Sequence, residues 1–336
     1  MKTKRHAVLV TTCFLFTFLF FVSGGSYCTA VHAADADYPN KPITLVVPLA
    51  PGGLADIGAR ILAEAMEKQL KQPVVVVNKT GGGTTVGGYA VVSAKPDGYT
   101  LGYGILAGAA LMPEIYNFFI AAPYSSKDLK TICTVNSFFM GVIVKGDAPW
   151  NSMNDLIEYA RKNPGQLKFA HNGKGGPQYM MWSSIAKAEN LRIVDVPYDG
   201  DGAAIPAVLG GHVPVALPAY ALVKQLAEAK KVKVLAVTTE KRIDSTSPPA
   251  MGELGFKLPI YSLPMGLFAT KSLPDSIVAK IDDTVRKIVE DKDFVAKNKS
   301  ADLVMEYRNA ADAEKYLARF RDNLTTFFKE EGFVKK

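Results

Sequence analysis

The sequence is poor in cysteine, histidine and tryptophan, and these shortages limit the chemistry open to it. Its 336 residues include three cysteines, four histidines and two tryptophans. Cys13 and Cys28 lie near the start, so a processed chain would keep Cys133 alone and could form no intrachain disulfide. Beyond residue 33 the histidines are His171 and His212, without a Cys pair or H-x-x-E spacing beside them. We therefore predict neither a disulfide framework nor a metal site.

Several cofactor and catalytic fingerprints are also missing. The segment "GGGTTVGG" has Val86 where a G-x-G-x-x-G dinucleotide fingerprint needs its third glycine, and "NGKGGPQ" has Gln178 there. Neither a G-x-x-x-x-G-K-[ST] phosphate loop nor a G-x-S-x-G hydrolase elbow occurs. Lys and Arg do not cluster with aromatic residues, which argues against nucleic acid as a partner. We predict no cofactor, no nucleic-acid partner and no enzymatic activity.

The first 33 residues have the pattern of an export signal. Three basic residues precede an uncharged run of 16 residues, Ala7 to Val22, and Val31-His32-Ala33 fits an A-x-A-like cleavage site. The alternative, a retained membrane anchor, is less favoured because the run is short for a bilayer. Bulky Tyr27 before Cys28 argues against a lipid-modified start. We predict a signal peptide over residues 1–33, a periplasmic location, and a net charge that falls from +7 to +4 on processing.

Beyond residue 38, short β-branched runs alternate with helical segments, which is the order of an α/β fold. Uninterrupted apolar runs suit strands that are buried on both faces of a parallel sheet. Two amphipathic helices, beginning near Pro274 and Asp312, are expected to close the chain without a strand between them. The expected strands are Ile43–Val47, Val74–Val77, Thr100–Tyr103, Gly141–Val144, Leu167–Ala170, Ile193–Val196, Val213–Leu217 and Val232–Val237.

Four junctions that follow expected strands are rich in glycine and small hydroxyl residues. They are Ala50–Asp56, Asn78–Gly88, His171–Gln178 and Pro197–Ala204. In an open α/β sheet, ligands bind beyond the carboxyl ends of the strands, and amides at helix starts attract anions. One glycine-rich turn is usually just a tight connection, but four at matching positions favour a binding site in a cleft between the two halves of the chain.

Single side chains in these junctions fit more than one role. Asp56 is better explained as an acid that favours the helix dipole than as a catalytic group. Thr84 and Thr85 suit hydrogen bonding to a ligand carboxylate and helix capping equally well. His171 fits either a ligand contact or a bond to loop backbone, and Tyr179 either the core or the wall of a pocket.

Taken in order, several segments resemble the substrate-binding proteins of tripartite tricarboxylate transporters, also called the Bug family. The resemblance begins with Tyr38–Gly104, which includes "LAPGGLADIGAR" and "PDGYTL", and continues through "VPYDGDGAAIPAVLGGHVPVAL", "KVKVLAVTTEKR" and "YSLPMGLFATKSLPDSIVAKID". It covers essentially the whole processed chain. It implies a type II periplasmic binding protein: two doubly wound α/β lobes with a ligand cleft between them. Such proteins capture a small organic carboxylate and deliver it to a membrane permease that has a large and a small subunit.

The resemblance also implies domain boundaries and a site. Lobe 1 would comprise residues 38–137 and 256–336, and lobe 2 residues 138–255. Main-chain N–H groups of the first two junctions would hold the ligand carboxylate, and loops of the second lobe would set specificity. The candidate ligand-binding residues are Pro51, Gly52, Gly53, Leu54, Ala55, Asp56, Gly82, Gly83, Thr84, Thr85, Ala107, His171, Gly173, Gly175, Gly176, Tyr179, Tyr198, Asp199 and Gly200.

The chain departs from the family pattern in places that bear on the ligand. The segment "GILAGAALMPEIY", which contains Ala107, replaces a Gly-Thr-rich turn, and Gln178-Tyr179-Met180-Met181 replaces a His-Leu-Ala-Gly helix start. Pro214 and Pro218 stand where acids are usual. These changes favour a monocarboxylate or a ligand with an aliphatic or aromatic body. We expect a monomer; the alternatives are an adaptor that presents its ligand to a sensor and a secreted hydrolase.

Overall fold

The computed structural model describes residues 37–109, 123–171, 176–198, 200–243, 245–258 and 261–330. The chain divides after Tyr38, and the elements below belong to the unit Pro39–Lys336. The predicted signal peptide lies outside the described residues, as do the candidate residues Gly173, Gly175 and Asp199. Within the part of the chain that is described, no helix is long and apolar enough to cross a membrane.

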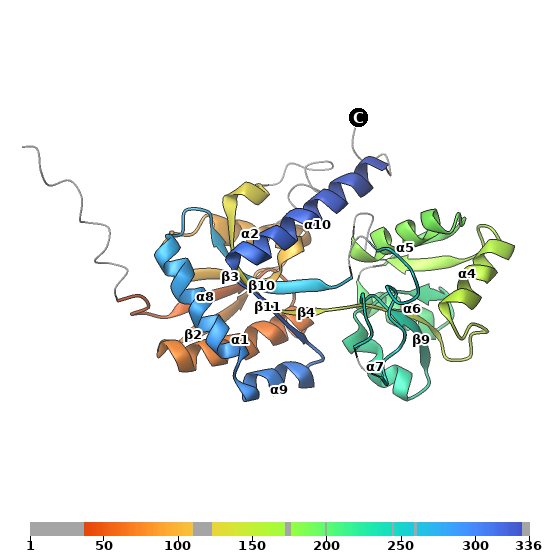
Figure 1. Cartoon of the computed structure of the whole chain (residues 1–336), viewed down its shortest axis with the longest axis horizontal. Helices are drawn as coiled ribbons and strands as arrows, with labels where there is room; N and C mark the ends of the chain where they lie inside the picture. Colours follow the sequence, from red (N-terminus) through yellow and green to blue (C-terminus); the bar gives the residue numbers. More distant parts are fainter. Residues whose placement is uncertain are drawn as a thin grey trace, which may run out of the picture. The chain divides into compact units, whose positions relative to one another are not determined.

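One sheet has six strands in the order β11-β4-β10-β3-β1-β2 (Figure 1). The neighbours β2, β1 and β3 are parallel, whereas β10 is antiparallel to both β3 and β4, and β11 is antiparallel to β4. The strands are β1 (Ile43–Val47), β2 (Val74–Asn78), β3 (Thr100–Ile105), β4 (Leu129–Phe138), β10 (Leu263–Thr270) and β11 (Val304–Arg308).

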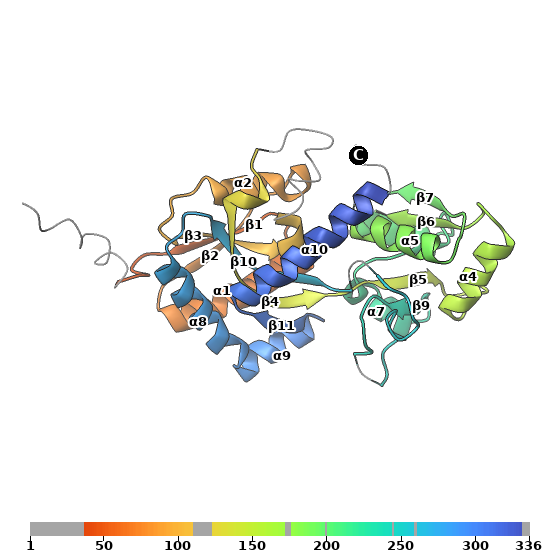
Figure 2. The same cartoon turned by 45° about the horizontal axis from the view of Figure 1, so that its top comes forward.

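Helices cover both faces of this sheet because its central strands are apolar on both sides. Val46 of β1 packs in one cluster with Val91 and Leu317, which lie on two of the covering helices. On the other face α1 contacts α8 and α9, as Figure 2 also shows. The helices are α1 (Leu54–Leu70), α2 (Thr85–Val92), α8 (Asp275–Val289), α9 (Lys292–Ser300) and α10 (Ala310–Glu330).

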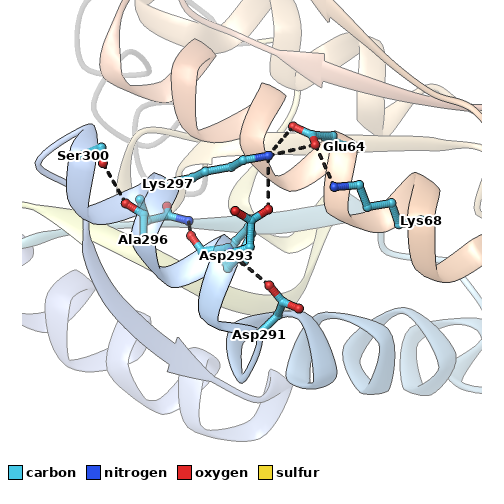
Figure 3. Close-up of polar contacts among 9 residues, drawn as sticks. Glu64, Lys68, Asp291, Asp293, Ala296, Lys297 and Ser300 are labelled. Carbon is cyan, nitrogen blue, oxygen red and sulfur yellow. Dashed lines mark hydrogen bonds and ion pairs between the residues drawn. The ribbon is translucent and has the colours of Figure 1, made fainter.

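A polar cluster joins α1 to α9 (Figure 3). The ammonium group of Lys297 lies 2.8 and 2.9 Å from the two carboxylate oxygens of Glu64 and 3.4 Å from Asp293. Lys68, one turn after Glu64 on α1, donates to the same carboxylate at 2.8 Å. Two cations therefore share one acid at this helix contact.

The second sheet has five strands in the order β7-β6-β8-β5-β9. Here β6 is parallel to β7 and β8, and β5 is antiparallel to β8 and β9. Its core includes Trp182, which is fully buried. The elements are β5 (Gly141–Lys145), α4 (Met153–Lys162), β6 (Lys168–His171), α5 (Pro177–Ala188), β7 (Val194–Pro197), α6 (Asp201–Leu209), β8 (Val215–Ala216), α7 (Tyr220–Glu228) and β9 (Val232–Val237).

The structure confirms an α/β fold with two doubly wound lobes but differs from the predicted strand pattern. The expected parallel pairing is confirmed for β1 with β2 and β3 and for β6 with β7 and β8, but β10 runs antiparallel to both of its neighbours and β5 antiparallel to β8 and β9. The C-terminal helices are not adjacent either, since α9 and β11 lie between α8 and α10. The strand β11 is a partly exposed edge strand, and its sequence VMEYR lacks the apolar run that marks a central strand.

Candidate ligand-binding site

The first junction, Pro51–Asp56, connects strand β1 to helix α1. No side chain caps the first amides of this helix. Gly52 has φ of 78°, which glycine adopts without strain, and Gly53 is the N-cap residue and has no side chain to offer. The first helical bond runs from the Ile57 amide to the Gly53 carbonyl at 3.0 Å. Helix geometry therefore leaves the amides of Leu54 and Ala55 without an intrahelical acceptor, as an anion site requires.

The Asp56 side chain holds this junction in place through its hydrogen bonds. Its carboxylate, 3% exposed, accepts bonds from the Gly52 amide at 2.9 Å, from Asn78 at 3.0 Å and from two nitrogens of Arg60 at 3.0 Å. Burial raises the pKa of Asp56, but the bonds from Arg60, Gly52 and Asn78 outweigh it and leave the pKa below its usual value. The acid is ionised and its oxygens are occupied, so we assign it a positioning role. Sequence reasoning missed Arg60 and Asn78; the four-residue spacing of Asp56 and Arg60 was the available signal.

The second junction contains an unpartnered hydroxyl. Gly82–Thr84 forms one 3₁₀ turn that leads into α2, and the Thr85 hydroxyl donates to the Gly82 carbonyl at 2.7 Å. Thr84 is the N-cap residue of α2 with φ of 86°, yet its side chain caps nothing. Its hydroxyl is buried without a hydrogen-bond partner among the described residues. The capping alternative thus fails for Thr84, whose hydroxyl is left without a described partner at this strand exit.

The first three strand exits meet at one edge of the six-stranded sheet. Because β1 pairs in parallel with β2 and β3, their carboxyl ends point the same way. The Lys79 amide donates to the Val47 carbonyl at 2.8 Å, which ties the second exit to the first. At the third exit, Ala107 is 6% exposed, and Gly108 lies beside Thr84: a Cβ on Gly108 would be 3.6 Å from the Thr84 hydroxyl. The structure therefore brings the lobe 1 candidates together.

The candidate residues of the second lobe lie at the ends of β6 and β7 and at the starts of the helices that follow them. Gly176 and Gly200 are the N-cap residues of α5 and α6, and neither helix has a side-chain cap. The Tyr198 amide donates to the His171 carbonyl at 2.8 Å, which joins the exits of β6 and β7. The His171 imidazole lies 3.2 Å from Asp195 of β7 and packs against Tyr179 with ring centroids 5.2 Å apart. Its ring thus contacts the neighbouring strand and α5.

Tyr179 and its neighbours on α5 take part in a hydrophobic cluster that also includes Phe327 of α10. The Tyr179 ring lies 6.5 Å from that of Phe327 on α10. Met180 and Met181, two of the residues that favoured a ligand with an aliphatic or aromatic body, are 2% and 0% exposed and belong to the hydrophobic core. An apolar ligand body remains a prediction without support from these two residues.

A polar pair that sequence reasoning missed lies at the start of α5 and α6. Asp201 accepts from the Ala219 amide at 3.0 Å and from the side-chain amide of Gln178 at 3.3 Å. Burial raises the pKa of Asp201, and these two bonds only partly oppose it. Gln178 and Asp201 are 23 residues apart, and no local spacing connects them. Within the described residues, no group of His, Cys, Asp and Glu is arranged to hold a metal ion.

Comparison with known proteins yields relatives over nearly the whole chain. The family model described as the tripartite tricarboxylate transporter family receptor matches residues 58–332. A Cupriavidus necator protein, described as the UPF0065 protein in the gbd 5' region, is 30% identical over 314 residues, which cover 90% of each chain. The solved structure of the periplasmic binding protein BugD is similar with a TM-score of 0.71 and 28% identity, over 89% of this chain and 100% of its own. An R. palustris protein solved with adipate has a TM-score of 0.74 and 24% identity, over 88% and 99% of the two chains.

Proposed function

Because the chain belongs to the tripartite tricarboxylate transporter receptor family, we propose that it captures a small organic carboxylate in the periplasm and delivers it to the membrane permease of such a transporter. The proposal includes export by cleavage of residues 1–33, a monomeric state and no catalysis. It also includes the two lobes as predicted, residues 38–137 with 256–336, and residues 138–255.

The uncapped start of α1 carries the proposal. The amides of Leu54 and Ala55 have no intrahelical acceptor, and the unpartnered Thr84 hydroxyl belongs to the neighbouring strand exit. Hydrogen bonds from such donors to an ionised acid are strong, and they need no permanent cation in the site. A buried carboxylate without these partners would be heavily destabilised. A small acid therefore suits this edge of lobe 1 better than a neutral solute does.

We propose that the second lobe adds its contacts when the protein closes on the bound acid. The uncapped helix starts at Gly176 and Gly200 would supply them. A ligand shifts an equilibrium between open and closed forms only by its different affinity for each. Closure would therefore couple recognition of the acid to docking on the permease.

The experiment begins with protein purified from periplasmic extract. Mass spectrometry identifies co-purifying acids, and calorimetry then measures the affinity of the best of them together with that of adipate. Gly53→Leu is the test variant: a Cβ at Gly53 would lie 3.5 Å from the Ala50 carbonyl, an ordinary contact, so the fold tolerates it while the side chain obstructs the α1 amides. Ala296→Leu, which adds a side chain at an exposed position of α9, is the control.

We expect Gly53→Leu to abolish measurable binding and Ala296→Leu to leave it unchanged. Unchanged affinity in Gly53→Leu would overturn the assignment of the site. Chemical conversion of the bound acid during prolonged incubation would instead identify an enzyme. A single elution species with the mass of one chain would support the monomer, and crosslinking to the permease in membranes would support delivery.

A further inference from the structure

Three helix starts of the second lobe meet around one acid. Strand β6 is parallel to both β7 and β8, so the helices that follow these three strands begin at the same edge of the sheet. Gln178 is the second residue of α5, Asp201 is the first residue of α6, and Ala219 is the N-cap residue of α7. The Asp201 carboxylate joins all three, because it bonds the Gln178 side chain and the Ala219 amide.

The bonding pattern fixes what Gln178 can offer. One Asp201 oxygen accepts from the Ala219 amide at 3.0 Å, and the other accepts from Gln178 Nε2 at 3.3 Å, so both oxygens act as acceptors. The nitrogen of the Gln178 amide is therefore turned toward Asp201. Its oxygen Oε1 is buried without a hydrogen-bond partner among the described residues, and the whole residue is only 6% exposed.

A buried amide oxygen without a donor is destabilising, and such groups in folded proteins call for a specific partner. Gln178 lies at the start of α5, beyond the carboxyl end of β6, and this position in lobe 2 corresponds to the strand exits of lobe 1 that we propose hold the carboxylate. A carboxylate would not satisfy it, because an ionised acid has no hydrogen to donate and would face the charge of Asp201. A hydroxyl, an amide N–H or an ammonium group would satisfy it.

We propose that Gln178 Oε1 accepts a hydrogen bond from the ligand end opposite its captured carboxylate, so the protein selects acids with a hydrogen-bond donor there and rejects a second carboxylate. This inference rests on the proposed function and adds the class of acid to it. Asp201 is a positioning residue in this arrangement, since it holds the Gln178 amide in the orientation that presents oxygen.

The first test is the binding order of the unmodified protein. Calorimetry compares four six-carbon acids that differ only at the far end: adipate, 6-hydroxyhexanoate, 6-aminohexanoate and hexanoate. The same comparison among succinate, 4-hydroxybutanoate and butanoate covers a shorter ligand. In the series that binds, we expect a donor-bearing acid to bind at least about tenfold more tightly than the diacid and the unsubstituted acid. A diacid that binds as tightly as its donor-bearing counterpart would overturn the inference.

The second test reverses the orientation of Gln178. In Asp201→Asn the new side chain keeps its acceptor for the Ala219 amide and gains an N–H group that bonds Gln178 Oε1 after the glutamine amide rotates. Gln178 Nε2 then faces the ligand, and we expect the preference to move from the donor-bearing acid toward the diacid by about tenfold. Gln178→Met, of similar length and without an acceptor, should remove the advantage of the hydroxy acid over hexanoate even if Asp201→Asn fails to fold.

The control is Asp147→Asn, which removes one charge from an exposed side chain of the same lobe that pairs only with Lys145 at 3.1 Å among the described contacts. It should leave the binding order unchanged. If no acid binds the unmodified protein, the proposed function fails and this inference fails with it. If acids bind but both Gln178→Met and Asp201→Asn keep the original order, this inference alone fails.

Discussion

Arg60 holds the Asp56 carboxylate with two nitrogens: Nε donates to one oxygen and Nη2 to the other, each at 3.0 Å. The two residues are one turn apart on α1, and Asp56 lies in the first turn of that helix. The same carboxylate reaches back to the Gly52 amide and across to Asn78 at the end of β2. This pair therefore fixes the turn whose amides we assign to the ligand, although neither side chain is proposed to contact it.

Asp56→Asn should weaken both folding and binding. The substituted amide presents an N–H group where two or more donors converge, so at least one donor loses its acceptor. We expect a loss of roughly 1–3 kcal/mol in the free energy of unfolding by urea, and about tenfold weaker affinity for the best-binding acid by calorimetry. Asp283→Asn, which removes an exposed acid paired with Arg286 and Lys287 on α8, should change neither by a comparable amount. Equal effects of the two substitutions would contradict the role of Asp56 in holding the junction in place.

The strands that the sequence predicts correctly are those whose buried positions are filled by apolar residues. The strands Ile43–Val47 and Val232–Val237 are confirmed to the residue, because each is a short, mainly apolar run whose pattern is local. The β4 segment LKTICTVNSF, which the sequence did not predict as a strand, has Thr, Asn and Ser at buried positions. The Thr134 and Asn136 side chains bond partners far along the chain. Asn136, for example, accepts from Tyr103 and donates to Asn298, and both bonds depend on the tertiary structure.

The candidate site likewise combines local features that the sequence predicts with tertiary contacts that it does not. The backbone features of the first two junctions could be predicted, because glycine and threonine after an apolar strand are local signals. Side-chain pairs that cross between exits could not be, since Asp56 with Asn78 and Gln178 with Asp201 are 22 and 23 residues apart. Their meeting depends on which strands are neighbours in the sheet.

Thr84→Val and Thr85→Val should separate binding from folding. The Thr84 hydroxyl is buried without a described partner, so its removal should leave the melting temperature unchanged or slightly higher while the best-binding acid loses about tenfold or more in affinity. The Thr85 hydroxyl bonds the Gly82 carbonyl within the turn, so its removal should lower the melting temperature. Valine keeps the shape and β-branching of threonine, so the positive φ at position 84 is equally strained in both proteins. If Thr84→Val bound the acid normally, its hydroxyl would have no part in the site.

The Glu64 cluster should contribute a measurable pH dependence to stability. Bonds from Lys297 and then Lys68 lower the pKa of Glu64 to about 2, below its unfolded value near 4.3. A lowered pKa in the folded state means that the contribution is complete above the unfolded value and is lost as the pH falls toward 2. Because the groups are half-exposed, solvent reduces the effect, and we expect Glu64→Gln to lower the melting temperature at pH 7 by only about 1–2 °C.

Scans at pH 7, 5, 4 and 3 check this point. The difference between Glu64→Gln and the unmodified protein should be constant from pH 7 to pH 5 and shrink below that. It should also shrink in high salt, since exposed ion pairs are screened. A difference that grew on acidification would contradict the lowered pKa. Ser300→Ala, on the exposed end of the same helix α9, is the control and should show no pH-dependent difference.

The Cys133 thiol should be unreactive toward thiol reagents in the folded protein. It lies in the middle of β4, has no exposed surface and is not in a disulfide. Burial raises the pKa of its thiol, and the nearby Asp282 carboxylate raises it further. The thiolate is the reactive form, so both the burial of the sulfur and its raised pKa oppose reaction.

In protein without residues 1–33, we expect no reaction with a thiol reagent at pH 8 until urea unfolds the chain, when one thiol per molecule reacts. Ser300→Cys places a second thiol at an exposed position, and that variant should show one fast thiol while folded and two after unfolding. A fast reaction of the unmodified folded protein would mean that β4 opens readily, and the buried bonds of Asn136 on the same strand would then be equally open to solvent.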